Sequence, residues 1–228
     1  PTIKSCISTS NHLLLVIDGT TKQAQSLAVV GGWDNVVSCS LAKMNSLPTL
    51  LREYSAEWIS ICHVSDIVSN GAVRALAGHL QQTSKDTVLT CDDIIVCQLW
   101  NDGLGYEHRQ YRSPVSAIRL CTRGGIGGLL TIPYSLIKLC TFAPNYTCLE
   151  ALRLDLLLQI TRKNIRTSHC HQALVKHQSS KNPSIPEQGW PRERCLFSEK
   201  QLDEIDRIRS QHAKQYFGIE RGLKPNPL

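Results

Sequence analysis

The feature that most constrains the fold is a run of apolar residues that stops at an acidic one, and it recurs along the chain. His12–Ile17 reads HLLLVI and is followed at once by Asp18, and Trp58–Cys62 reads WISIC and leads within four residues to Asp66. Short apolar runs bounded by turn residues predict buried strands. In open α/β sheets the carboxyl ends of the strands often hold the ligand, so we expect Asp18 and Asp66 to face one cleft.

Two more strands and a helix fit the same layout. We expect strands over Asn35–Ser38 and Thr87–Thr90, and the second is followed by Asp92 and Asp93. Apolar residues at helical spacing predict an amphipathic helix over Gly71–Gln82. Strands that alternate with helices predict an α/β fold with a mostly parallel sheet flanked by helices. We expect the acids after the later strand to open on the same cleft.

Two further elements are predicted in the second half of the chain. Leucine and isoleucine residues at helical spacing predict a helix from about Cys148 to Arg162. Ala173–Lys176 fits a short strand that ends at His177. Residues 1–177 are therefore expected to form the main domain.

The composition changes after the main domain, at residue 178. The next twenty residues are polar and carry three prolines, which predicts a linker or an extended arm. Ser198 and Gln201 then form an S-x-x-Q capping box, which predicts a helix that runs to about Phe217. We expect residues 178–228 to form an appendage whose helix docks its apolar stripe on the main domain or on a partner.

Composition sets the broad class. The chain has 228 residues, of which 42% are hydrophobic and 19% charged, which excludes a disordered or collagen-like protein. The most apolar stretch, Ile126–Ala143, is interrupted by Pro133, Ser135 and Lys138, so we expect no transmembrane segment. The chain begins at Pro1 with neither a Met nor a signal-peptide pattern, so we expect a cytoplasmic protein whose natural start is missing.

Charge and cysteine usage narrow the partners. The chain has 25 basic and 19 acidic residues, a net charge of +6. The basic residues are scattered, whereas a nucleic-acid-binding protein concentrates them on one face, so we expect no nucleic-acid partner. A basic nucleic-acid-binding module stays open as an alternative that rests on charge. The ten cysteines include no C-x-x-C pair, which favours buried thiols of a reducing compartment, although their even number leaves disulfides open.

The order of several motifs resembles that of the family-2 glycosyltransferases. EWISICHVSD resembles their strand that leads to an Asp-x-Asp-Asp metal motif, and TCDD resembles their next acidic strand end. GGIGGLLTIPYSLI resembles their glycine-containing strand and the helix start after it, and RLDLLLQITRKNIRTSHCHQALVKH resembles their late block. The resemblance implies an A-type, Rossmann-like fold that transfers a sugar from a nucleotide sugar to a glycan, lipid or protein acceptor.

The resemblance also implies a donor and metal site, with departures. Asp18 matches the acid that contacts the nucleotide in the family. The segment from His63 to Asp66 aligns with Asp-x-Asp-Asp, so Asp66 remains while His63 and Ser65 replace two acids. His177 matches the late histidine of the family's metal site. We therefore expect Asp66 and His177 to hold a divalent metal, Mg²⁺ or Mn²⁺, more weakly than three acids would.

Further residues are implied for catalysis and donor binding. The family places its catalytic base two residues before the acid that here is Asp155, and this chain has Arg153 there, which cannot act as a base. Glu150, one turn earlier, is the nearby substitute, so the resemblance points to Glu150 and Asp155 as catalytic candidates. A solvated acid in the first turn of a helix is the alternative interpretation of Glu150.

Donor contacts are expected from Asp92 and Asp93 and from one basic residue. The loop around Arg109 mixes aromatic and basic side chains, which suits stacking on a base or sugar and pairing with phosphate. An ordinary solvated loop is the alternative for Arg109. Because the metal and base motifs are eroded, a catalytically degenerate relative that binds a sugar nucleotide or another protein stays open beside the enzyme. The H-C-H spacing of His169 and His171 raises a zinc hypothesis, which the sequence does not strengthen with a second ligand pair.

Overall fold

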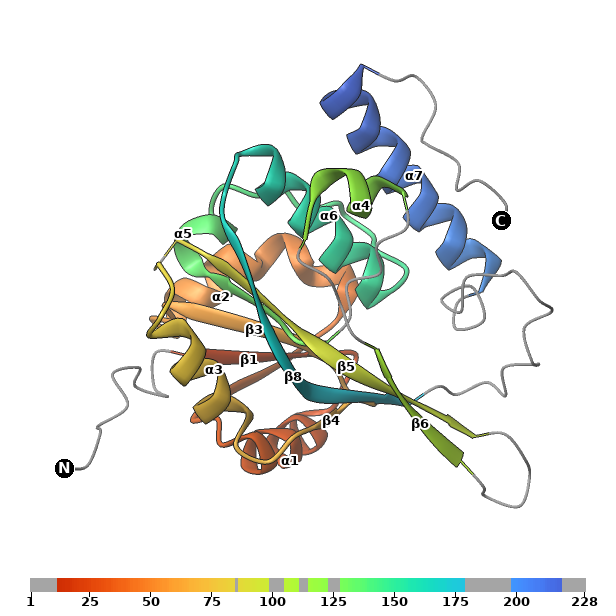
Figure 1. The fold of residues 1–228 in the computed structure, drawn as a ribbon. Coiled ribbons are helices and arrows are strands. Elements are labelled where there is room, and N and C mark those ends of the chain that lie inside the picture. Colours follow the sequence, from red (N-terminus) through yellow and green to blue (C-terminus); the bar gives the residue numbers. More distant parts are fainter. Residues whose placement is uncertain are drawn as a thin grey trace.

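The structure is a computed structural model that describes residues 12–84, 86–98, 105–110, 115–122, 128–178 and 198–218. For residues 95–98, 105–110 and 177–178 it describes the backbone without the side chains. Strands and helices alternate along most of this chain, as the sequence predicts (Figure 1).

Eight strands and eight helical segments make up the described residues. The strands are β1 (His12–Ile17), β2 (Asn35–Cys39), β3 (Trp58–His63), β4 (Ile67–Val68), β5 (Val88–Gln98), β6 (Gly105–Gln110), β7 (Leu130–Pro133) and β8 (Thr167–Gln178). The helices are α1 (Thr21–Gly31), the 3₁₀ helix η2 (Leu41–Ser46), α2 (Leu47–Glu53), α3 (Ala72–Leu80), α4 (Ala117–Thr122), α5 (Tyr134–Ile137), α6 (Leu149–Arg162) and α7 (Glu199–Phe217).

One sheet joins the strands in the order β2-β1-β3-β7-β5-β8-β4, with β6 paired to β5. β2, β1 and β3 are parallel, and β8 is parallel to β5. β7 is antiparallel to both β3 and β5, so β3 and β5 run the same way. β4 and β6 are antiparallel to their neighbours. Five of the eight described strands therefore share one direction, and the predicted mostly parallel α/β sheet is confirmed.

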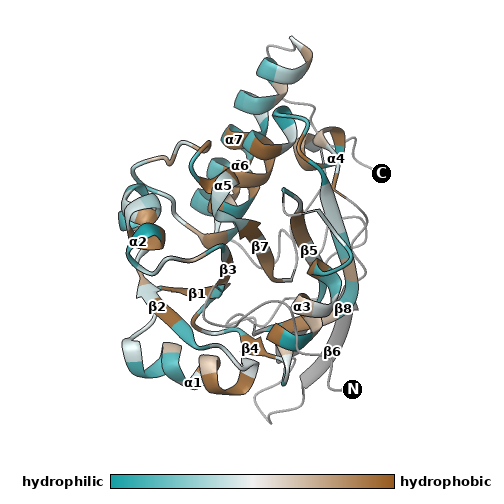
Figure 2. Ribbon diagram, turned by 90° about the vertical axis from the view of Figure 1, so that its left-hand side faces the viewer, coloured by the Kyte–Doolittle hydropathy of each residue, from teal (hydrophilic) through white to brown (hydrophobic). Residues whose placement is uncertain are grey.

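Two apolar layers hold helices on the two faces of the sheet. In β1, Leu13, Leu15 and Ile17 face the layer that contains α2, α5 and α6, while Leu14 and Val16 face the layer that contains α1 and α3. All six residues of β1 are buried, because a central strand of such a sheet is covered on both faces. Figure 2 shows the hydrophobic central strands between the two sets of helices.

The predicted C-terminal helix forms and docks on the main domain. The Ser198–Gln201 capping box is present, and Ile205 and Ile208 are buried in the same apolar cluster as α6. Figure 1 shows α7 beside α6 and α4. Most of the expected linker, residues 179–197, lies outside the described residues, so the division at residue 177 stays a prediction.

Two predicted strand boundaries are wrong. β5 continues to Gln98 and β8 begins at Thr167, so Asp92 and Asp93 lie within a strand and not after its end. Polar residues usually indicate the end of a buried strand, because they are rarely buried without partners. Here the neighbouring strand supplies a partner, as the contact between Asp92 and His169 shows.

Four of the described helical segments were not predicted from the sequence: α1, η2, α2 and α4. A T-x-x-Q capping box at Thr20 and Gln23 nevertheless marks the start of α1. Among the described residues, the structure contains no helix that combines the length and apolar character needed to cross a bilayer.

Candidate functional site

Asp18 and Asp66 follow neighbouring parallel strands, as predicted. Asp18 is exposed and adopts a left-handed backbone with φ of 59°, a conformation that Asp tolerates better than most residues. Its amide donates to Cys39 O at 2.8 Å, next to the end of β2. The amide of Val64 donates to Ile17 O at 3.1 Å. The ends of β1, β2 and β3 therefore meet around Asp18.

The turn from His63 to Asp66 is closed by its own hydrogen bonds. The His63 amide donates to Asp66 Oδ2 at 2.7 Å, and Asp66 is 4% exposed. His63 Nδ1 lies 2.9 Å from Ser65 Oγ and accepts a hydrogen bond from the Ser65 amide at 3.2 Å. The sequence therefore folds locally into a tight turn whose single carboxylate points inward.

This turn does not fit the hard divalent cation that the family resemblance implies. Mg²⁺ and Mn²⁺ favour several oxygen ligands, whereas the turn offers one carboxylate, one imidazole and one hydroxyl, and the imidazole and hydroxyl bind each other. β4 pairs with β8 through Ile67 and Lys176, which places the backbone of His177 beside Asp66. The side chain of His177 lies outside the described residues.

The side chain of Arg153 in α6 is buried against the residues that precede β7. It is 2% exposed, and its Nη2 donates a hydrogen bond to Gly128 O. Burial raises the pKa of the Cys62 thiol well above its ordinary value; the Asp66 carboxylate raises it further and the Arg153 guanidinium opposes them. The acid that remains from the metal motif and the arginine that replaces the base therefore both act on the Cys62 thiol.

Gly128, whose carbonyl binds Arg153, lies in close contact with the backbone of β5. Its φ is 66°, and a Cβ there would collide with the backbone carbonyl of Cys91. Glycine is the residue that such a left-handed, crowded position permits. The remaining glycines of the cluster, residues 124, 125 and 127, lie outside the described residues.

Glu150 lies in the first turn of α6, where it faces Arg153. Its Oε2 is 3.8 Å from Arg153 Nη1. The side chain of Glu150 is 18% exposed, against 2% for Arg153. The carboxylate of Glu150 is therefore accessible to solvent and forms an ion pair with a buried arginine.

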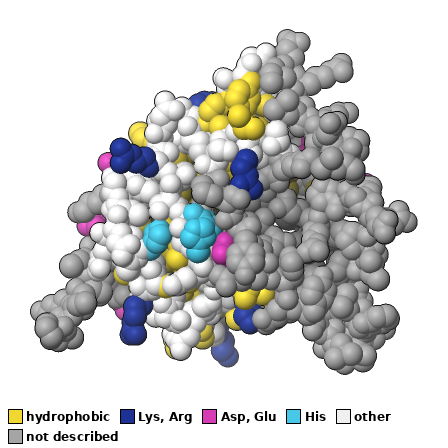
Figure 3. Space-filling model, in the orientation of Figure 1, with side chains coloured by type: hydrophobic (Ala, Val, Ile, Leu, Met, Phe, Trp, Pro, Cys, Tyr) yellow, Lys and Arg dark blue, Asp and Glu magenta, His cyan; other side chains and the backbone are white. Residues whose placement is uncertain are grey.

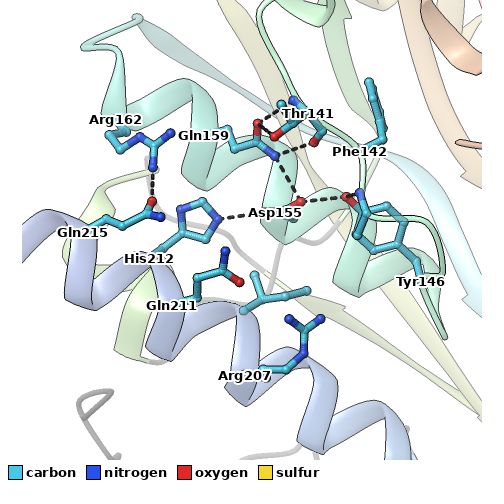
Figure 4. Close-up of a pocket in the computed structure, with 12 residues that line it drawn as sticks. Thr141, Phe142, Tyr146, Asp155, Gln159, Arg162, Arg207, Gln211, His212 and Gln215 are labelled. Atoms are coloured by element: carbon cyan, nitrogen blue, oxygen red, sulfur yellow. Dashed lines mark hydrogen bonds and ion pairs between the residues drawn. The ribbon is translucent and has the colours of Figure 1, made fainter. Parts of the chain in front are cut away.

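Asp155 lies on another side of α6, in contact with α7. It accepts hydrogen bonds from Tyr146 Oη at 2.6 Å and from Gln159 Nε2 at 3.1 Å, and its Oδ1 is 2.7 Å from His212 Nε2. Burial, and then the charge of Asp155, raise the pKa of the Tyr146 phenol. Figure 4 shows these side chains directed toward Asp155 from both helices and the loop before α6.

A cavity of about 220 Å³ opens next to this network. Figure 4 shows that α6 and α7 supply most of its walls. Its lining is largely polar: Thr141, Phe142, Ala143, Tyr146, Asp155, Gln159, Arg162, Arg207, Ile208, Gln211, His212 and Gln215. Glu150 and Asp155, the two catalytic candidates, thus have different surroundings, because Glu150 does not line this cavity.

A third group of polar side chains joins β5 and β8. Asp92 is fully buried, and its Oδ1 lies 2.9 Å from His169 Nε2. The exposed His171 ring packs edge-on against His169, with ring centres 4.8 Å apart. Burial, followed by the charges of His169 and His171, lowers the pKa of His79 on α3. Figure 3 shows histidine side chains side by side on the face of the molecule that β8 crosses in Figure 1.

The structure thus separates residues that the sequence grouped. Asp18 and Asp66 lie near strand ends, while Asp92 is bound to His169 within the sheet. Asp93 is also buried in β5. The loop expected around Arg109 is wrong in part, because Gly105–Gln110 pairs with β5 as strand β6. The side chain of Arg109 lies outside the described residues.

Some residues of these groups had no signal in the sequence. Each of these residues hydrogen-bonds to a partner that lies 9 to 89 positions away in the chain: Thr90, His79, Tyr146 and His212. His79 is also influenced by the charges of two distant histidines. The His-Cys-His motif at residues 169–171 was the one sequence pattern that indicated the group around His169 and His171.

Comparisons with known proteins support the fold. No protein-family model matches the chain, and none of the curated proteins matches it. Among solved structures, residues 1–349 of S. aureus TarS, a glycosyltransferase, match with a TM-score of 0.51 and 11% identity over 94% of this chain. A second S. aureus TarS structure matches with a TM-score of 0.47, 10% identity and 92% coverage of this chain, which corresponds to 41% of that chain. A197 from STIV matches with a TM-score of 0.41 and 9% identity over 72% of this chain and 83% of its own.

The chain spans 60% of the length of the first TarS structure. At this identity the likeness concerns the fold alone. The chain therefore has a glycosyltransferase-like α/β fold.

Proposed function

We propose that this chain is a relative of the family-2 glycosyltransferases that binds a nucleotide sugar at the carboxyl ends of β1 and β3. The observation that carries the proposal is the placement of Asp18 and Asp66 after two neighbouring parallel strands. Open α/β sheets bind their ligands at this edge. The TarS-like fold and the order of the sequence motifs support the same site.

Each acid suits a different part of donor binding. Asp18 is exposed, so its carboxylate can accept hydrogen bonds from the hydroxyl or imide groups of a nucleoside. Asp66 is buried and held by the His63 amide, so it would fix the shape of the turn that borders the donor. Asp93 and Arg109 stay predicted donor contacts.

Arg153 supplies positive charge that acts on Cys62, near the carboxyl end of β3. A buried guanidinium acts through a medium of low dielectric constant, where a charge is felt more strongly than in water. It therefore favours the negative diphosphate of a bound donor. Because Arg153 stands at the family's base position and cannot accept a proton, we propose that sugar transfer is slow.

Glu150 is the carboxylate that we propose for any remaining base catalysis. It is one turn from Arg153 and accessible to solvent. An acceptor hydroxyl that approaches the first turn of α6 would meet its Oε2. Asp155 is the weaker candidate, because Tyr146, Gln159 and His212 all bind its carboxylate.

A second candidate function is donor binding without transfer. It is favoured by the buried Arg153, whose hydrogen bond to Gly128 makes it part of the fold. Donor binding is common to both candidates, and turnover separates them.

Isothermal titration of the whole chain with uridine and guanosine sugar nucleotides, with and without Mn²⁺, tests the proposal. We expect one donor class to bind, and Mn²⁺ to change its affinity little because the turn fits that ion poorly. Asp18→Asn should weaken binding about 10-fold, the loss of one charge-assisted hydrogen bond. Asp34→Asn is the matched control, because Asp34 is exposed and precedes the opposite end of β2.

Two outcomes decide between the alternatives. An absence of heat with every donor would refute the donor site. If a donor binds, release of its nucleoside diphosphate in the presence of acceptor mixtures distinguishes a slow transferase from a binding protein.

A further inference from the structure

Three side chains come together where β5 meets β8: Asp92, His169 and His171. One carboxylate oxygen and two ring nitrogens lie within 4.8 Å of one another. Ligands bound at about 2.0–2.2 Å from a metal ion are separated from each other by about 3 Å. The 2.9 Å between Asp92 Oδ1 and His169 Nε2 already meets that spacing. The ligand nitrogen of the exposed His171 lies within 4.8 Å of both atoms, and a change of its side-chain torsions would bring it to the same spacing.

An irregularity in the sheet creates this arrangement. Cys91 is opposite Cys170, but the next residue, Asp92, is opposite Ala173. The register between β5 and β8 therefore skips His171 and Gln172 at this point. Such bulges re-aim side chains and are frequent beside functional sites.

Thr90 fixes the orientation of the His169 ring. Its Oγ1 lies 2.9 Å from His169 Nδ1 and 3.4 Å from the carbonyl oxygen of Ser168. If the Thr90 hydroxyl donates to Ser168, it accepts from Nδ1–H of His169, and a lone pair on Nε2 then faces Asp92. A cation between Nε2 and the carboxylate satisfies every group in this chain of contacts. Metal-bound histidines are held in this way by a partner on their second nitrogen.

We propose that Asp92, His169 and His171 bind a divalent first-row transition metal ion of the Zn²⁺ type. Two imidazoles and one carboxylate form a donor set that such ions accept and that Mg²⁺ and Ca²⁺ do not favour. Three protein ligands leave a position for water or an outer ligand, and the exposed His171 makes that position accessible. The site goes beyond the proposed function, because it uses neither Asp18 nor Asp66 and requires no donor.

Two neighbours are excluded from the donor set and serve as controls. Cys170 lies between the two histidines, but it is 4% exposed and packs in the apolar layer of α1 and α3, as expected for alternate residues of a strand. His79 Nε2 lies 2.9 Å from Ser168 Oγ, and its ring nitrogens are not among the ligand atoms that meet within 4.8 Å.

The test is metal titration of the full chain after treatment with a chelator. Isothermal titration with Zn²⁺ should show one saturable site that the variants below remove, and Co²⁺ should give visible absorption bands that Zn²⁺ abolishes. His171→Asn is the leading variant, because an exposed side chain can be replaced without unfolding the protein. It should lower Zn²⁺ affinity at least about 10-fold and shift or remove the Co²⁺ bands.

Further variants assign the other ligands. His169→Asn and Asp92→Asn should also lower Zn²⁺ affinity at least about 10-fold, with circular dichroism of the metal-free protein to confirm folding. Thr90→Val should lower it about 10-fold through loss of orientation. Cys170→Ala and His79→Asn should bind Zn²⁺ as the unmodified chain does.

Three results would overturn the proposed metal site. It is overturned if the unmodified chain binds no Zn²⁺, or if His171→Asn binds it as tightly as the unmodified chain. It is also overturned if Cys170→Ala removes the site, because a thiolate would then be the ligand. None of these results bears on sugar-nucleotide binding, which is measured at Asp18.

Discussion

The Nε2 atom of His212, in α7, lies 2.7 Å from the Oδ1 atom of Asp155, in α6. The same carboxylate accepts hydrogen bonds from Tyr146 and Gln159. A residue that the family resemblance marks as a catalytic candidate is therefore also the polar anchor of the C-terminal helix.

Asp155→Ala should destabilise the protein through loss of this anchor. Hydrogen bonds to a charged group contribute about 1.5–3 kcal/mol each, and donors left unsatisfied in a partly buried site add to the cost. We expect the free energy of unfolding, measured by urea denaturation, to fall by about 2–4 kcal/mol. Asp203→Ala, an exposed acid of α7, should change it by less than about 0.5 kcal/mol. A variant that keeps its stability but loses sugar transfer would instead identify Asp155 as catalytic.

A second prediction concerns His12, which is buried at the start of β1. Its Nε2 lies 3.0 Å from Ser60 Oγ, and its ring packs edge-on against Trp33. Burial lowers the pKa of His12 from 6.5 to about 3. Between pH 6.5 and about pH 3, His12 is therefore protonated in the unfolded chain but neutral in the folded chain. The free energy of unfolding is consequently unaffected by His12 above pH 6.5 and decreases as the pH falls from 6.5 toward 3.

The pH dependence of unfolding measures this effect against His12→Gln, which keeps a polar side chain and does not titrate. Between about pH 7.5 and pH 4, the unmodified chain should lose about 3 kcal/mol more stability than the variant, because each pKa unit corresponds to about 1.4 kcal/mol. Equal losses in both proteins would mean that His12 charges in the folded state.

Part of this architecture follows from local patterns in the sequence. The apolar runs before Asp18 and Asp66 predict β1 and β3, because a strand covered on both faces needs continuous apolar residues. Capping residues mark the start of α7 for a similar local reason. The existence of these three elements is decided within a few residues, and so it could be predicted.

The rest depends on contacts between distant segments. The length of β5 could not be predicted, because Asp92 is tolerated inside it through His169, 77 positions away. The antiparallel position of β7 between β3 and β5 is also determined by contacts between segments that are distant in the sequence. The sequence shows Arg153 at the base position, but its burial against Gly128 depends on how α6 packs on the sheet.

A third prediction concerns the close contact between Gly128 and β5, and it compares two glycines with similar backbone conformations. Gly128 has φ of 66° and a crowded site, while Gly32 has φ of 77° and no atom within 4 Å of the place that a Cβ would occupy. Gly32→Ala should cost about 1 kcal/mol, the strain of a left-handed alanine. Gly128→Ala should cost more than about 3 kcal/mol, because the backbone of Cys91 must also move. Comparable losses of stability in urea denaturation would show that β5 can move to accept a methyl group at residue 128.

The last prediction concerns the turn from His63 to Asp66. His63 is half-buried and Ser65 is exposed, so acids at both positions should be tolerated. The double variant His63→Asp, Ser65→Asp would add two carboxylates beside Asp66 and give the oxygen-rich set that Mn²⁺ favours. We expect Mn²⁺ affinity to rise at least about 10-fold, equivalent to about 1.4 kcal/mol, measured by isothermal titration.

Turnover should respond differently from metal affinity in that variant. General-base assistance contributes about 10²- to 10⁴-fold to a rate, and Arg153 still stands at the base position. Donor turnover should therefore stay slow in the double variant even with Mn²⁺ bound, and should rise when Arg153→Asp is added to a chain that remains folded. A large gain from the double variant alone would locate the base elsewhere, with Glu150 the first residue to replace, because its carboxylate is both accessible and 3.8 Å from Arg153.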